Sequence, residues 1–227
     1  PDPSYFDSHK FSVGRLRHVL RAKAVLCPGL EVTFLDEATG EKDEWHYEDG
    51  LKDYLLQATQ SWETLPVDPF VGSFSGSNEA ADWAVQWLPE GGDLIQESYV
   101  NLIPTAQGGT HVNGLRTGLM DAMREYCEFR NLLPRGIKLA PDDLWNNCCY
   151  VLSSKLGDPQ FSGQTKERLS SREAAAFGSG VAKDSFSLWL NQHTEEGDLL
   201  AEFCINNAQK RVRSSKKIVR KKITQGP

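Results

Sequence analysis

Apolar and polar residues alternate in several short segments of the first half of the chain, a pattern typical of half-buried β-strands. The alternating apolar positions are Val32 and Phe34, then Trp45 and Tyr47, then Trp83, Val85 and Trp87. Residues 70–74 and 99–103 also predict strands, because aromatic and β-branched side chains favour a pleated surface. Turn-forming residues at 37–40 and 90–93 predict tight connections. We expect a region of antiparallel strands.

Helical periodicity marks the ends of this region and most of the second half. Before the strands, Ser12 is a suitable cap for a helix to about residue 24, with Leu16, Val19 and Leu20 on one face. A short helix is expected over 49–60. Residues 113–131 predict a long helix whose buried face has helical spacing, namely Leu115, Leu119, Met123 and Tyr126.

The remaining elements complete a mixed fold. Pro141 begins a short helix, and residues 148–154 predict a buried strand, so that strand, long helix and strand form a βαβ unit. After an irregular stretch at 157–169, residues 170–173 match a capping box that opens a helix to about residue 191. A last helix is expected from about 194 toward 222. The periodicity therefore predicts an α+β domain followed by long helices.

Composition narrows the class of protein. Hydrophobic residues make up 39% of the 227 residues, enough for a sizeable core. No run of apolar residues is long enough for a transmembrane helix, and the start lacks a signal-peptide pattern. The five cysteines form no CxxC pair, so we expect buried, reduced thiols in a cytoplasmic protein and no metal site. Because the chain lacks an initiator Met, we expect it to be part of a longer protein.

Charge is unevenly distributed along the chain. Residues 210–227, the basic tail, hold eight Lys or Arg and no acidic residue, whereas the other 209 residues carry 17 basic and 31 acidic side chains. Such a tail can bind a DNA backbone with salt-dependent affinity. It can equally be a solvated helix that folds against acidic neighbours. The tail alone does not decide between these alternatives.

Two glycine-containing segments are candidates for binding an anion. In Gly163-Gln164-Thr165-Lys166, the lysine is a compact, mobile cation suited to a phosphate, but the P-loop spacing GxxxxGK[ST] is absent. Gly108-Gly109-Thr110-His111 precedes a helix N-terminus, where backbone N–H groups attract anions. Taken alone, both patterns favour ordinary turns. No nucleophile motif is present, and Trp83 and Trp87 are expected in the core.

Longer motifs around these segments identify a resemblance. Residues 98–116, SYVNLIPTAQGGTHVNGLR, resemble the signature of the B subunit of bacterial topoisomerase IV, and residues 158–169, DPQFSGQTKERL, resemble the segment that carries the QTK loop of that family. The related gyrase B subunits usually have an acidic residue after Gly-Gly-Thr-His, where this chain has Val112. The resemblance covers the whole chain.

The resemblance implies a fold and a division of the chain. It implies the transducer fold, an α+β domain with a mixed sheet and a left-handed βαβ crossover, followed by long C-terminal helices. Residues 1–28 would be the exit segment of a GHKL ATPase domain, residues 29–192 the transducer, and residues 193–227 a long basic helix leading toward a TOPRIM domain. The nucleotide pocket itself would lie outside this chain.

The resemblance also implies roles for particular residues. Lys166, the counterpart of the family's QTK lysine, would contact the γ-phosphate of ATP held by the other domain, with Gln164 beside it. ATP and Mg²⁺ would be the cofactors of the full subunit, whereas this part alone would be inactive. Without a phosphate, the loop at residues 160–167 is expected to be mobile.

Partners follow from the same resemblance. They are DNA, the A subunit of topoisomerase IV and a second copy of the B subunit in an ATP-bound homodimer, in the bacterial cytoplasm at the nucleoid. The candidates for facing DNA are Arg116, Arg124, Arg130, Lys216, Lys217 and Lys221. The alternative from a different class is a non-catalytic module that binds nucleic acid or protein through its basic C-terminal helix.

Overall fold

The computed structural model describes residues 2–5, 7 and 10–224, with side chains described up to residue 215. Five strands form one mixed sheet in the order β3-β4-β7-β5-β6. The strand bounds are β3 Leu65–Ser75, β4 Glu79–Trp87, β5 Gln96–Val100, β6 Ile103–Pro104 and β7 Cys148–Leu156. The central strand β7 pairs antiparallel with β4 and parallel with β5. Its first seven residues are buried, as its unbroken apolar run predicts.

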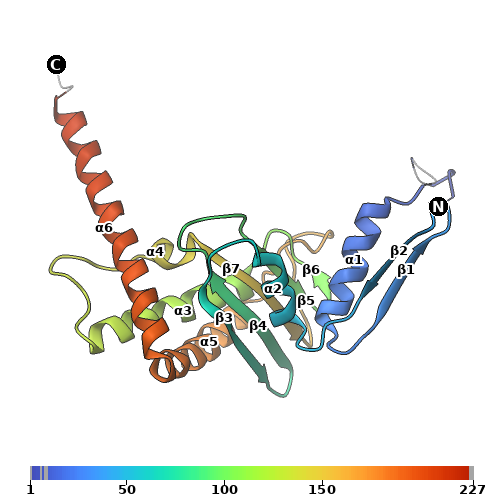
Figure 1. The fold of residues 1–227 in the computed structure, drawn as a ribbon, viewed down its shortest axis with the longest axis horizontal. Coiled ribbons are helices and arrows are strands. Elements are labelled where there is room, and N and C mark those ends of the chain that lie inside the picture. Colours follow the sequence, from blue (N-terminus) through green and yellow to red (C-terminus); the bar gives the residue numbers. More distant parts are fainter. Residues whose placement is uncertain (1, 6, 8–9, 225–227) are drawn as a thin grey trace.

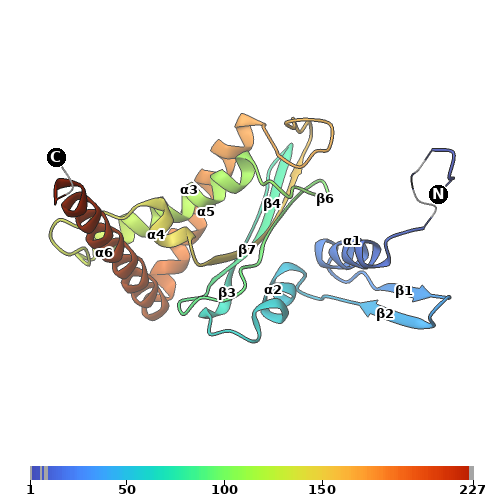
Figure 2. The same cartoon turned by 90° about the horizontal axis from the view of Figure 1, so that it is seen from above.

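Helices cover both faces of this sheet (Figures 1 and 2). Their bounds are α1 Val13–Leu26, α2 Leu51–Thr59, α3 Thr110–Phe129, α4 Pro141–Trp145, α5 Arg172–Gln192 and α6 Thr194–Thr224. α3 and α5 pack on one face, and α2 with the end of α1 packs on the other. Neighbouring cysteines mark the two sides, since Cys148 lies in the first core and Cys149 in the second. The predicted α+β architecture with C-terminal helices is confirmed.

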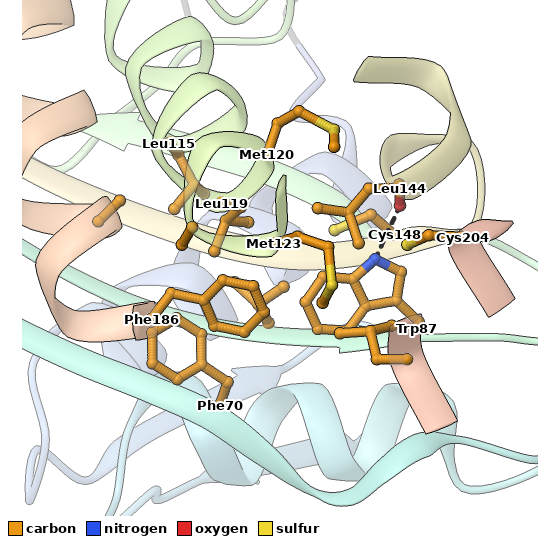
Figure 3. Close-up of a cluster of buried hydrophobic side chains, with 14 of the residues drawn as sticks. Phe70, Trp87, Leu115, Leu119, Met120, Met123, Leu144, Cys148, Phe186 and Cys204 are labelled. Carbon is orange, nitrogen blue, oxygen red and sulfur yellow. Dashed lines mark hydrogen bonds between the residues drawn. The ribbon is translucent and has the colours of Figure 1, made fainter. Parts of the chain in front are cut away.

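The larger core lies between the sheet and the α3–α5 layer. Figure 3 shows Trp87 in this core, with its indole Nε1 donating to the Leu144 carbonyl oxygen at 2.8 Å. The Phe186 ring from α5 stacks on Trp87 with ring centroids 5.9 Å apart. The predicted core face of α3 is confirmed, because Leu115, Leu119, Met123 and Tyr126 are all buried.

A hairpin of β1 (Val32–Asp36) and β2 (Glu41–Trp45) lies against α1, apart from the main sheet (Figure 2). Arg17 joins them, since its Nε donates to Asp43 at 2.6 Å and its Nη2 to Glu41 at 2.7 Å. Ser12 caps α1 as predicted, with its Oγ accepting the Arg15 N–H at 3.4 Å. Of the three apolar residues expected on one face of α1, Leu16 and Leu20 are half-buried and Val19 is 39% exposed.

The single strand predicted over 99–103 is also wrong. Asn101 and Leu102 have positive φ values of 49° and 65°, so the chain reverses there and β6 pairs back on β5. Asparagine tolerates this conformation. Its side-chain amide also exchanges two hydrogen bonds of 2.9 Å with the backbone of Leu156, at the end of β7. A tertiary contact therefore stabilises a turn that strand propensity obscured.

Two glycines allow α3 and α5 to lie unusually close together. A Cβ at Gly114 would be 2.7 Å from the Ala175 carbonyl oxygen, and one at Gly118 would be 2.6 Å from the Ser179 carbonyl oxygen. Both obstacles are backbone atoms of α5, which a side-chain rotation cannot move. The close contact makes the two helices one packed unit.

A buried hydrogen-bond chain fixes the turn that leads into α3. The Thr105 hydroxyl donates to the Ser98 carbonyl oxygen at 2.9 Å, and its Oγ1 lies 3.1 Å from His111 Nε2. His111 is 3% exposed, and its Nδ1 has no partner among the described residues. Burial lowers the pKa of His111 to about 4, because a charged ring would lose its hydration. The histidine is therefore a neutral structural residue.

The close helix contact predicts opposite outcomes for two glycines. Gly118→Ala should lower the free energy of unfolding by roughly 1–3 kcal/mol, because the new methyl group overlaps backbone. Gly180→Ala, at an exposed α5 position with nothing within 4 Å of its Cβ, should raise it by about 0.5–1 kcal/mol through helix propensity. Urea denaturation of both variants measures the difference. Equal stability of the two variants would exclude the close contact.

The buried histidine predicts a pH dependence. Because the folded pKa lies below the ordinary value of 6.5, the unfolded chain binds the proton more tightly, and stability falls as the pH drops from 6.5 toward 4. This loss should be on the order of 3 kcal/mol. His111→Gln, which retains a donor for Thr105, should remove that part of the slope. Parallel slopes for the two proteins between pH 6.5 and 4 would refute the role of His111.

Candidate functional site

The predicted irregular stretch after β7 contains a closed loop, residues 160–170, here called the lysine loop. Phe161 and Leu169 form an antiparallel bridge at its neck. Two backbone bonds reinforce the bridge, from Ser162 N to the Arg168 oxygen at 2.9 Å and from Ser170 N to the Gln160 oxygen at 2.8 Å. The tip is the exposed sequence Gly163-Gln164-Thr165-Lys166. The bridge therefore closes the loop at its neck and leaves the tip exposed.

The neck of the lysine loop is bonded to residues 107–110, here called the glycine turn. Leu169 N donates to the Gly108 oxygen at 3.0 Å, and Thr110 N donates to the Leu169 oxygen at 3.1 Å. Gly109 has a φ of 137°, and a Cβ there would lie 2.5 Å from the Leu169 nitrogen and closer still to its oxygen. Only glycine fits this position. The two segments singled out separately in the sequence thus form one unit.

The capping box predicted at residues 170–173 is wrong in its chemistry. α5 begins after Ser171, but no side chain caps it. The Ser171 Oγ instead accepts the Gln160 N–H at 2.8 Å. Ser171 is buried, and its hydroxyl serves the backbone of the lysine loop rather than that of the helix. The start of α5 is therefore tied to the loop, as the start of α3 is tied to the glycine turn.

Lys166 lies at the exposed tip in a left-handed backbone conformation, with a φ of 57°. Its ammonium nitrogen lies 5.9 Å from the centroid of the Phe161 ring. The neighbouring Glu167 carboxylate accepts a hydrogen bond of 2.9 Å from Gln107 Nε2. No salt bridge of Lys166 is present within the described ranges. The cation is thus available to an anion from outside, with Gln164 exposed beside it.

Helix α6 is anchored to the helical layer by a buried carboxylate that sequence patterns did not reveal. Asp143 of α4 is 3% exposed and accepts from Arg211 at 3.0 Å (Nε) and 2.9 Å (Nη2). Asn207 also donates to the Asp143 carbonyl oxygen, at 2.8 Å. These three residues, the α6 anchor, fix the direction in which α6 leaves the domain. The only local signal was Asp143 in the first turn of a short helix.

A second contact holds the beginning of α6. Asp198 accepts a hydrogen bond from the Tyr126 hydroxyl at 2.7 Å and one from Arg130 at 3.0 Å. Burial, and then the Asp198 hydrogen bond, raises the pKa of Tyr126 to about 12, so the hydroxyl remains a donor. α6 is therefore attached to the end of α3 and to α4.

The predicted DNA-facing arginines all have partners within the chain. Arg116 forms an ion pair with Asp142, Arg124 pairs with Asp121 and donates to the Leu139 oxygen, and Arg130 pairs with Asp198. Each is still about one-third exposed, with side-chain exposures of 34%, 39% and 36%. The side chains of Lys216, Lys217 and Lys221 lie outside the described residues. A DNA-facing role for these six residues stays a prediction.

Metal-binding and membrane-spanning features are both absent from the described residues. In that part of the chain, no group of three or more His, Cys, Asp or Glu side chains is arranged to hold a metal ion. None of the described helices combines the length and apolar composition needed to cross a bilayer.

Comparison with known proteins gives consistent matches. A family model described as DNA gyrase B matches residues 33–219. The B subunit of DNA topoisomerase 4 from Pseudomonas aeruginosa is 69% identical over all of this chain, which spans 36% of that relative. The topoisomerase IV ATP binding domain of Francisella tularensis, solved with a small-molecule inhibitor, has a TM-score of 0.81 and 39% identity, covering 93% of this chain and 57% of that one.

A solved structure of a gyrase B subunit is also similar to this chain. The 43K ATPase domain of Thermus thermophilus gyrase B, solved with an aminocoumarin, has a TM-score of 0.82 and 25% identity, and the match covers 96% of this chain and 58% of that one. The family-model match extends over most of the chain and includes both the glycine turn and the lysine loop. The chain therefore belongs to the DNA gyrase B family and is similar, within it, to the B subunits of topoisomerase IV.

Proposed function

We propose that this chain is the transducer part of the ATP-hydrolysing subunit of a type IV topoisomerase. Lys166 senses the γ-phosphate of ATP held by a separate domain, and the helices relay that contact to DNA strand passage, relaxation and decatenation. One observation carries the proposal. An exposed lysine without an ion-pair partner among the described residues stands on a loop whose neck is bonded to the starts of both long core helices.

The energetics define what the lysine contributes. A charge-assisted contact with a phosphate is worth roughly 1.5–3 kcal/mol net. Switching a two-state equilibrium from 1:99 to 99:1 takes about 5.5 kcal/mol. Lys166 therefore cannot act alone, and Gln164 together with dimerisation of the B subunit supplies the rest. Hydrolysis removes the γ-phosphate from the site, so the nucleotide state biases the domain orientation.

The relay follows the packing of the helices. The lysine loop is bonded to the glycine turn at the start of α3 and, through Ser171, to the start of α5. α3 and α5 are in close contact, and α5 leads directly into α6. The α6 anchor then connects α6 back to α4. A displacement of the loop neck would therefore move these helices together rather than one at a time.

Other parts of the machinery are assigned outside this chain. The nucleotide pocket and the Mg²⁺ that accompanies ATP belong to the preceding GHKL domain, and this chain by itself hydrolyses no ATP. In this division residues 1–28 are the exit from that domain, 29–192 the transducer and 193–227 the helix toward TOPRIM. The A subunit of topoisomerase IV and DNA are the partners, in the bacterial cytoplasm.

The lysine can be tested in a complete B subunit that contains this chain, assembled with its A subunit. Lys166→Ala should reduce ATP turnover and ATP-dependent relaxation at least about tenfold, since 1.4 kcal/mol of lost stabilisation corresponds to a factor of ten. Unfolding of the variant should match that of the unmodified protein. Lys155→Ala, which removes an exposed lysine at the end of β7, is the matched control. Normal relaxation by Lys166→Ala would exclude the proposed role.

The basic tail generates a separate prediction. Replacing Lys216, Lys217 and Lys221 with glutamine should weaken DNA binding. The slope of log K against the logarithm of the salt concentration should become less steep by about three, one unit for each phosphate that the tail no longer neutralises. The control replaces Lys42, Lys155 and Lys183, which changes the net charge equally on the acidic body. Titrations at several salt concentrations measure both slopes. An unchanged slope in the tail variant would show that the tail is a solvated helix.

A further inference from the structure

Lys166 has an aromatic neighbour in the structure that the proposed role does not require. Its ammonium nitrogen lies over the Phe161 ring, 5.9 Å from the centroid. An aromatic ring carries negative charge on its face and attracts a cation within about 6 Å. Phe161 stands in the neck of the lysine loop and Lys166 at the end of its tip, so this contact connects the tip to the neck.

The Phe161 ring is fixed, whereas the lysine is on the exposed tip. Phe161 is bridged to Leu169 through its backbone, and its side chain packs against a small core made by Val100, Leu169 and Ala174. Lys166 is exposed and is held in a left-handed backbone conformation that costs free energy for any residue with a Cβ. The ring therefore acts as a stationary partner, and the lysine can leave it.

The neighbouring carboxylate has another hydrogen-bond partner. Glu167, the next residue, accepts a hydrogen bond from Gln107 on the glycine turn at 2.9 Å. Among the described residues, the Phe161 ring lies within attractive range of the Lys166 ammonium. A carboxylate at this point would neutralise the cation and oppose transfer to a phosphate more strongly. A ring holds the cation weakly and leaves its charge unpaired.

We propose that Phe161 is a positioning residue that holds Lys166 in a resting place from which the γ-phosphate must withdraw it. This inference rests on the proposed phosphate-sensing role of Lys166. The ring competes with the phosphate for the same ammonium group, so the strength of the ring contact sets the ATP concentration at which the enzyme responds. The saturated rate is unaffected, because the saturated enzyme no longer forms the resting contact.

The competition determines whether each substitution raises or lowers the ATP concentration for half-maximal hydrolysis in the complete enzyme. Phe161→Leu retains an apolar side chain and removes the ring, so it should lower the ATP concentration for half-maximal hydrolysis by about two- to fivefold. Phe161→Trp strengthens the cation–π contact and should raise that concentration by about twofold. The maximal rate should stay within about twofold in both variants, because the saturated state does not contain the contact.

An isosteric replacement separates electrostatics from packing. Pentafluorophenylalanine at position 161 has nearly the same shape as phenylalanine, but its ring face no longer attracts cations. It should behave like Phe161→Leu. If Phe161 had a purely structural role, the pentafluorophenylalanine variant would have an unchanged ATP concentration for half-maximal hydrolysis. The leucine and tryptophan variants would then both shift that concentration in the same direction. Either of those results would overturn the inference.

A double-mutant comparison distinguishes this inference from the proposed function. With Lys166→Ala as the background, the three changes at position 161 should have no effect on the ATP dependence, because the group on which they act is gone. If Lys166→Ala itself leaves hydrolysis normal, the proposed function fails. In a second outcome, Lys166→Ala impairs hydrolysis, but the changes at position 161 in the otherwise unmodified enzyme leave the ATP concentration for half-maximal hydrolysis unchanged or all shift it in one direction. That outcome excludes only the resting contact.

Discussion

The backbone of Leu169 is bonded on both sides to the glycine turn, and the position of the lysine loop at the start of α3 depends on this contact. Its N–H donates to Gly108, and its carbonyl oxygen accepts from Thr110. The absence of a Cβ at Gly109 allows the glycine turn and the backbone of Leu169 to approach this closely. Because α3 begins at the turn and α5 begins just after the loop, one pair of hydrogen bonds positions a candidate phosphate sensor relative to both helices.

The charged groups of the domain are used for orientation more than for stability. The ion pair Asp143–Arg211 recovers little net free energy, since the Asp143 carboxylate loses its hydration when it is buried, although Arg211 stays 41% exposed. It does, however, accept only one geometry, with two hydrogen bonds from the guanidinium and a third contact from Asn207. The exposed charge at the other end of the helical layer, Lys166, is left free for a ligand. Fixed charges thus direct α6, and an exposed charge at the loop tip is the proposed phosphate sensor.

Local patterns predicted most elements because burial on one face imposes a period on the sequence. The Trp83-Val85-Trp87 alternation arises because one face of a strand is buried, and the Leu115-Leu119-Met123 spacing arises because one face of a helix is buried. Both faces belong to the same core. The errors have a common origin. At the Asn101–Leu102 reversal and at Ser171, a residue distant in sequence supplies the hydrogen-bond partner, and local propensity contains no information about it.

The sequence by itself determined the family resemblance, the lysine motif, the α+β class and the segregation of positive charge at the C-terminus, because each is a property of neighbouring residues or of composition. Only the tertiary structure decided that the glycine turn supports the lysine loop, that Phe161 lies beneath the Lys166 ammonium, and that Asp143 holds α6. These contacts join residues brought together by folding, and the preference of each residue for its own local conformation is nearly the same whether or not the partner is there. The physical reason is that hydrogen bonds and charge contacts depend on distance in space, whereas a pattern records only order along the chain.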